Sequence, residues 1–89
     1  MCTYATEHVV VRGSGKAAGT WAPLARASVY VDHPYATPLD HTLNIDLFSE
    51  AEGRSRQIAL ELSLESAHVL LEAITRALVR SGDQSIEAP

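Results

Sequence analysis

The chain has 89 residues, 46% of them hydrophobic and 20% charged, a composition typical of one small globular domain rather than of a disordered chain. The formal net charge is −4 and the seven Lys and Arg residues are scattered, which argues against partners such as nucleic acid or an anionic membrane surface. The sequence has no signal peptide pattern and no apolar run that approaches the roughly 20 residues needed to cross a bilayer. With a single cysteine, Cys2, these features predict a cytoplasmic protein.

The first part of the chain predicts two strands joined by a long loop. Residues 7–12 contain three consecutive valines, which favour an extended and partly buried backbone. Residues 13–24 hold three glycines and a proline and predict a flexible loop. Residues 25–33 alternate between apolar and polar side chains, which predicts a second strand that ends at Pro34. The same alternation places His33 on the apolar face of that strand.

The second part predicts two more strands and a helix. Residues 41–48 and 56–62 both alternate, and a turn over residues 49–55 would join them as a hairpin. Ser63 is a good N-cap for a helix over residues 64–80, in which apolar residues recur three and four positions apart. Residues 1–82 are therefore expected to form one domain, and residues 83–89 a loose tail.

These elements predict the α+β class, with a four-stranded antiparallel sheet and one C-terminal helix on its apolar face. Four strands span about 19 Å, whereas one helix is about 10 Å wide. The helix can therefore cover about half of the apolar face. A second copy of the chain is the simplest cover for the rest, so we expect a homodimer.

Three histidines are expected at one end of this sheet. His8 begins the first strand, His33 ends the second and His41 begins the third, so strands that run up, down and up bring them together. Asp32 and Asp40 lie beside them. Three imidazoles with neighbouring carboxylates form a ligand set for a divalent metal, either zinc with an open position for water or non-haem iron.

Plainer interpretations of the same residues stay open. The separation of His33 and His41 matches no standard zinc spacing, and histidines at strand ends are often only surface residues. In extended backbone, Asp40 and His41 would point to opposite faces, as would Asp32 and His33, so neither pair is expected to form a carboxylate–imidazole contact. A second group of residues has no metal role in this hypothesis: Cys2 as a free thiol, His68 as a structural residue, and Tyr35 and Lys16 as catalytic or substrate contacts.

Four segments of the chain resemble a family of short bacterial proteins of unknown function. They are the opening MCTYATEH, the GSGK segment, DHP at residues 32–34 and HTLNID at residues 41–46. The resemblance brings no established activity. It implies that the following polar residues belong to the characteristic segments of the family and favours a site among them: Cys2, His8, Lys16, His33, His41, Asn44 and Asp46.

Two functional hypotheses follow from the sequence. In the first, the protein is a small homodimer with a histidine-lined polar pocket at one end of the sheet, which binds a metal and could act on a small molecule. In the second, it is a non-catalytic dimeric module that binds a protein or a small ligand through an exposed sheet face carrying Tyr30, Thr42 and Phe48. The sequence leaves open whether the protein is an enzyme, and it does not identify the ligand.

Overall fold

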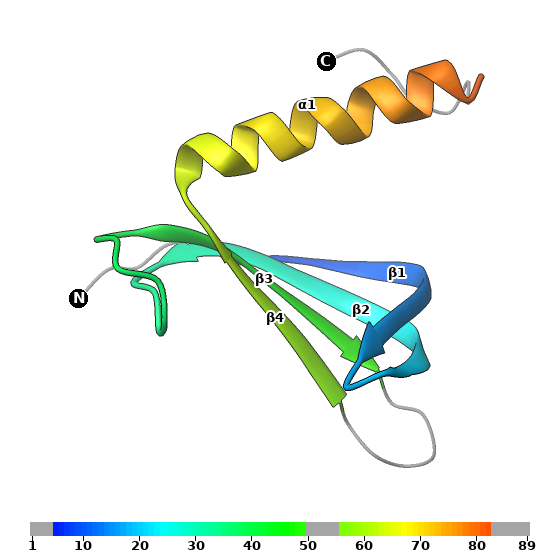
Figure 1. The fold of residues 1–89 in the computed structure, drawn as a ribbon, viewed down its shortest axis with the longest axis horizontal. Coiled ribbons are helices and arrows are strands. Elements are labelled where there is room, and N and C mark those ends of the chain that lie inside the picture. The colour runs from blue at the N-terminus through cyan, green and yellow to red at the C-terminus, as the bar shows by residue number, and fades with distance from the viewer. Residues whose placement is uncertain (1–4, 50–55, 83–89) are drawn as a thin grey trace.

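The computed structural model describes residues 5–49 and 56–82. One antiparallel sheet with strand order β1-β2-β3-β4 is followed by a single helix, α1 (Figure 1). The expected α+β architecture is therefore confirmed. The tail over residues 83–89, Cys2 and most of the turn between β3 and β4 lie outside the described residues. The elements are β1 Glu7–Ala17, β2 Thr20–Asp32, β3 Thr42–Ser49, β4 Arg56–Leu62 and α1 Leu64–Arg80.

The glycine-rich segment after residue 12 is a β-hairpin, and the prediction of a long flexible loop there is wrong. Paired residues continue from Gly13 opposite Leu24 to Ala17 opposite Thr20. The turn residues Ala18 and Gly19 have φ values of 53° and 80°, as a tight hairpin turn with two left-handed positions requires. Glycine content suggested a loop, but the two-residue turn lets both flanking segments complete a ladder of backbone hydrogen bonds.

The paired strands keep the two faces that the sequence predicted. Val29 lies opposite Ile45 on the apolar face, and Tyr30 lies opposite Asn44 on the polar face. On β4, Leu60 opposes Ile45 and therefore also belongs to the apolar face. His33 and His41 lie just outside the ends of β2 and β3, so strand alternation does not fix the direction of either ring.

A bulge bends β1 across the apolar face. Val10 pairs with Arg26 and Gly13 with Leu24, so two residues of β1 oppose one of β2, which bends and twists the bulged strand. Figure 1 shows β1 turning sharply beyond this point. The bend brings Gly15 against β4, where a Cβ atom added to Gly15 would lie 2.8 Å from Cδ1 of Ile58. A small apolar layer therefore forms between the hairpin and β4.

Helix α1 lies over the other end of the apolar face but stands away from it (Figure 1). Its N-terminus is capped as expected, since Oγ of Ser63 accepts a hydrogen bond of 3.0 Å from the backbone N–H of Ser66. No residue of α1 is buried. Among the described residues, Ala27 is the one buried hydrophobic side chain. The helix therefore does not close the core by packing onto its own sheet.

Candidate functional site

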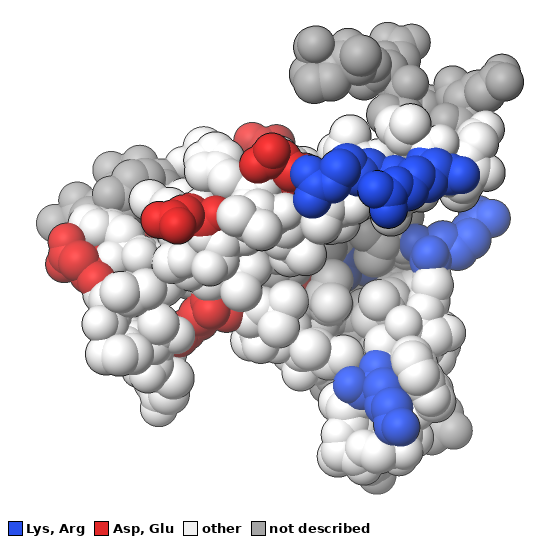
Figure 2. Space-filling model, turned by 45° about the horizontal axis from the view of Figure 1, so that its top comes forward, with Lys and Arg blue, Asp and Glu red and all other residues white. Residues whose placement is uncertain are grey.

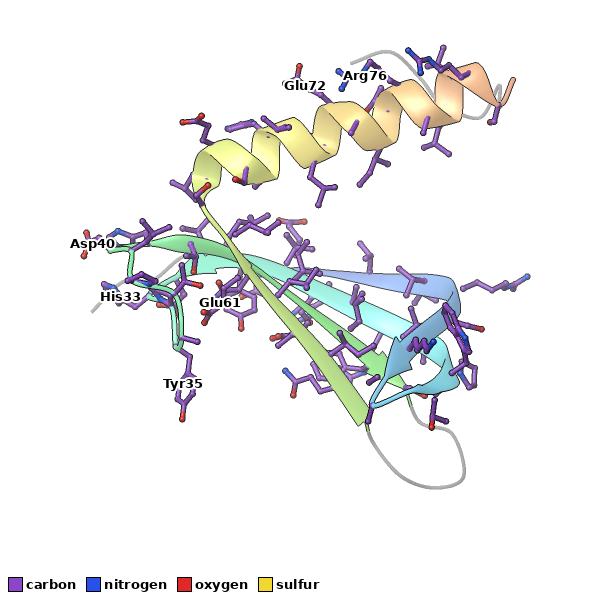
Figure 3. All side chains as sticks on the ribbon, in the orientation of Figure 1. His33, Tyr35, Asp40, Glu61, Glu72 and Arg76 are labelled. Carbon is purple, nitrogen blue, oxygen red and sulfur yellow. The ribbon has the colours of Figure 1, made fainter. Side chains whose placement is uncertain are left out.

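The loop between β2 and β3 is held on the polar side of the sheet by Glu61 of β4. The Glu61 carboxylate accepts hydrogen bonds from the backbone N–H groups of Tyr35, Ala36 and Thr37, and from Oγ1 of Thr37 at 3.0 Å. Figure 3 shows Glu61, Tyr35 and His33 gathered at this end of the sheet. The Glu61 carboxylate thus anchors the loop between β2 and β3 to the edge strand β4.

Because the loop is anchored to β4, it crosses the polar face of β3, and residues on that face are buried. Thr42 is 0% exposed and Asn44 is 6% exposed, and Oγ1 of Thr42 donates a hydrogen bond of 2.6 Å to Oδ1 of Asn44. The expectation that Thr42 belongs to an exposed binding face is therefore wrong. Phe48 is half-buried, with the Arg26 guanidinium 4.1 Å from the centre of its ring.

A pocket of about 500 Å³ lies between the polar face and the loop. Its floor carries a connected polar network, in which the Tyr30 hydroxyl donates a hydrogen bond of 2.8 Å to Oδ2 of Asp46. The Asn44 side chain also hydrogen-bonds to Tyr30. The polar network therefore runs from the buried Thr42 through Asn44 and Tyr30 to the carboxylate of Asp46. The polar residues that line the pocket include Tyr30, Asp32, His33, Asn44, Asp46 and Glu61.

The hydrogen bonds fix the protonation of two of these groups. Donation to the Asp46 carboxylate, with smaller effects of burial and of the nearby negative charge, raises the pKa of Tyr30 above 10.0. Tyr30 is therefore a phenol at neutral pH and a poor general base. The backbone N–H groups of Tyr35 and Ala36 stabilise the charged form of Glu61 and lower its pKa below 4.5. Glu61 is therefore a carboxylate at neutral pH.

His33 and His41 form a stacked pair at the rim, with ring centroids 4.7 Å apart. Nδ1 of His33 lies 3.1 Å from the Asp40 carbonyl oxygen, and Nδ1 of His41 lies 3.1 Å from Oδ2 of Asp40. Both oxygens are acceptors, so each neutral ring carries its proton on Nδ1 and has Nε2 as its basic nitrogen. The expectation that Asp40 and His41 cannot meet is wrong, because Asp40 lies in the loop, where strand alternation does not apply.

The other predicted site residues lie apart from this pair. His8 pairs with Ser28 in the sheet, with its Nδ1 2.9 Å from Oγ of Ser28. Ser28 precedes His33 by five positions, or about 16 Å along an extended strand. Lys16 lies at the opposite end of β2, with Nζ 5.8 Å from the ring centroid of Trp21.

Asp32 contacts its neighbour through the backbone, since its Oδ1 accepts a hydrogen bond of 2.7 Å from the N–H of His33. Tyr35 is 100% exposed at the pocket mouth, and Figure 3 shows it at the tip of the loop. Within the described part of the chain, no three His, Cys, Asp or Glu side chains are placed to hold one metal ion. The structure therefore brings together His33, His41 and Asp40, but not His8.

The sequence reasoning missed the role of Glu61, which the alternation of β4 marks simply as outward-facing. Asn44 and Asp46 entered the candidate site only through the family resemblance, because the alternation of β3 does not reveal their contacts with Tyr30. The sequence carried no separate signal for these contacts, because polar residues at positions 42, 44 and 46 are also what an ordinary solvent-facing strand face shows. What the arrangement provides is an acidic, hydrogen-bonding pocket on an α+β scaffold.

The chain belongs to a family of unknown function, DUF6295, whose family model matches residues 1–87. No curated protein and no solved structure matches the chain. Across residues 5–49 and 56–82, no helix is both long and apolar enough to cross a membrane.

Proposed function

We propose that the protein is a binding module for a small, positively charged molecule, which it takes up in the pocket between the polar sheet face and the loop. The observation that carries this proposal is the charge of the lining. The described residues around the pocket include the acids Asp32, Asp46 and Glu61 but no Lys or Arg. A pocket of about 500 Å³ is of the size that holds a small organic ligand.

The hydrogen-bond inventory of the pocket also favours a ligand rich in donors. Carboxylates only accept hydrogen bonds, and the Tyr30 hydroxyl already donates to Asp46. A protonated amine would complement Asp46 and Asp32, whereas a carboxylate or phosphate would meet like charge. Tyr30 has its pKa raised by the Asp46 contact, so the floor of the pocket is suited to binding rather than to proton abstraction at neutral pH.

The experiment is a calorimetric titration with three probes of equal chain length and different charge: putrescine, butanediol and succinate. We expect binding of putrescine and no heat with the other two. The Asp46→Asn variant keeps the shape of the side chain and an acceptor for Tyr30 but loses the charge, and we expect it to lose about tenfold in affinity or more. Glu72→Gln, on the outer side of α1 (Figure 3), is the matched control and should bind as the wild type does. Equal affinity of the Asp46→Asn variant and the wild type would refute the proposal.

A metal ion is a second candidate ligand, favoured by the histidine pair. Asp40 orients both rings through Nδ1, which is the arrangement that carboxylates and carbonyls give to metal-binding histidines. Zinc or iron at Nε2 of His33 and His41 would need further donors from water, the ligand or a second copy. Metal analysis of tag-free protein, alone and as His41→Ala, tests this role. Loss of a stoichiometric metal in the variant is expected, and equal metal content in both would rule the pair out as ligands.

With either ligand, we propose that the protein is a homodimer. The described residues bury one hydrophobic side chain, Ala27, which is too small a core for a domain of this length to fold stably alone.

A further inference from the structure

We propose that the polar pocket selects long linear diammonium ions, because Asp32 and Asp46 bind one ammonium group each. This inference rests on the proposed binding of a cation in the pocket and adds the class of ligand and the two residues that set its length. Both carboxylates line the same pocket, of about 500 Å³. Figure 2 shows acidic side chains towards the end of the molecule where the loop between β2 and β3 lies, and Lys and Arg towards the opposite end. This distribution of charge favours cations at the pocket.

The third acid of the lining, Glu61, already has its charge compensated by the loop. Its Oε2 accepts a hydrogen bond from the backbone N–H of Tyr35. Its Oε1 accepts from the backbone N–H groups of Ala36 and Thr37 and from Oγ1 of Thr37. A carboxylate has about four acceptor sites, so these donors fill it. Glu61 therefore holds the loop and leaves the charge of the ligand to the other two acids.

Asp32 and Asp46 each accept one hydrogen bond within the described part of the chain. Oδ1 of Asp32 accepts at 2.7 Å from the backbone N–H of His33, and Oδ2 of Asp46 accepts at 2.8 Å from the Tyr30 hydroxyl. One hydrogen bond uses about a quarter of the acceptor sites of a carboxylate. Each acid can therefore also accept from an ammonium group.

The register of β2 and β3 sets the distance between the two acids. Asp32 lies opposite Thr42, and Asp46 follows Thr42 by four positions on β3, so both belong to the polar face. Four residues along a strand and one step to the neighbouring strand place their Cα atoms about 14 Å apart. Ammonium groups in line between the carboxylates would shorten this span by a contact of about 2.8 Å at each end. The two charges of the ligand should therefore lie about 8–14 Å apart.

This spacing favours longer diamines over putrescine. An extended chain advances at most about 3.6 Å over the three backbone bonds of a residue, or about 1.2 Å per bond. The nitrogens of putrescine are therefore at most about 6 Å apart, and those of octane-1,8-diamine about 11 Å. Putrescine reaches one of the two acids at a time, whereas octane-1,8-diamine reaches both. Ala36 and Ala59 also line the pocket, and their small side chains leave room for the methylene chain.

Calorimetric titration of the full chain with diamines of different length tests this inference. The probes are putrescine, hexane-1,6-diamine, octane-1,8-diamine and decane-1,10-diamine. We expect octane-1,8-diamine to bind about tenfold more tightly than putrescine, or more. The control ligand 8-aminooctan-1-ol has the same length but a single charge, so it separates the second ion pair from contacts of the methylene chain. It should bind about tenfold more weakly than octane-1,8-diamine, and this comparison needs no variant of the protein.

The Asp32→Asn variant tests which acid binds the second ammonium group. Asparagine keeps an acceptor for the backbone N–H of His33 but has no charge, so the preference for octane-1,8-diamine over putrescine should fall below about threefold. Glu72→Gln, on the outer side of α1 (Figure 3), is the matched control and should keep the full preference. Equal affinity for all four diamines, or a preference that survives in Asp32→Asn, would overturn this inference and leave the proposed binding of a small cation standing. Absence of binding by every diamine would instead refute the proposed function, and this inference with it.

Discussion

Gly15 tests whether the β1–β2 hairpin folds across the sheet onto β4. An alanine Cβ at this position would lie 2.8 Å from Cδ1 of Ile58 and 3.0 Å from Cδ2 of Leu24. Both atoms are the ends of flexible side chains that can shift, so the cost of overpacking should fall at the lower end of its usual range, about 1 kcal/mol. We expect Gly15→Ala to lower the free energy of unfolding by that amount, measured by urea denaturation at a fixed protein concentration, because dimerisation would make stability depend on concentration.

Two further variants make this result specific. Gly13→Ala is the control in the same strand, because an added Cβ there meets nothing within 4 Å, and it should be neutral or stabilise by up to about 1 kcal/mol. Ile58→Val removes the Cδ1 atom that clashes and costs about 0.5–1.5 kcal/mol alone. Combined with Gly15→Ala, it should cost less than the sum of the two single changes. Equal effects of Gly13→Ala and Gly15→Ala, or strict additivity with Ile58→Val, would refute the packing described here.

Three other predictions concern the polar pocket. Thr42→Val leaves the buried Oδ1 of Asn44 without the Thr42 donor and should cost about 1–3 kcal/mol in urea denaturation, so an unchanged midpoint would contradict the burial described. The folded-state pKa of Glu61 lies below its unfolded value of 4.5, so its stabilisation is complete above that pH and is lost as the pH falls through the lower value. The protection of the loop amides that it holds, taken relative to their intrinsic exchange rates at each pH, should fall in acid, and Glu61→Gln should show severalfold lower protection already at neutral pH. The folded-state pKa of Tyr30 lies above its unfolded value of 10.0, so the contribution of its proton is complete below that pH and is lost as the pH rises through the folded value. Tyr30→Phe should therefore cost about 1 kcal/mol at neutral pH, and the difference from wild type should shrink in alkali unless the contact with Asp46 is absent in solution.

In a single copy of this chain, part of the polar face of the sheet is buried, whereas the apolar face is partly exposed. The polar face contains the fully buried Thr42 beneath a loop, whereas the apolar face carries Leu60 at 40% exposure. A loop held by hydrogen bonds can cover polar groups within one chain. Apolar groups need a large complementary surface, which one helix does not provide. The polar pocket therefore forms within one chain, whereas the apolar face of that chain stays largely exposed.

The candidate site could be predicted only in part. His33 and His41 were expected to meet, and they do so because each lies next to the end of a strand in the pair β2–β3. His8 was expected to join them, but β1 begins opposite Val29, well short of the end of β2. Strand direction is available from the sequence, whereas the register between strands depends on where the hairpin turn falls. An early turn at Ala18 and Gly19 set that register.

The sequence by itself determined the elements whose cause is local. Alternation defined the apolar and polar faces of β2 to β4, and the Ser63 cap with its following stripe defined α1, because a period and a cap involve residues within a few positions of each other. The tertiary structure decided the contacts between residues far apart in the sequence. An example is the hydrogen bond that Glu61 accepts from the backbone of Tyr35, 26 residues earlier. It also decided that α1 stands away from its own sheet. Such contacts depend on register, bulges and partner surfaces, which no local pattern of side chains encodes.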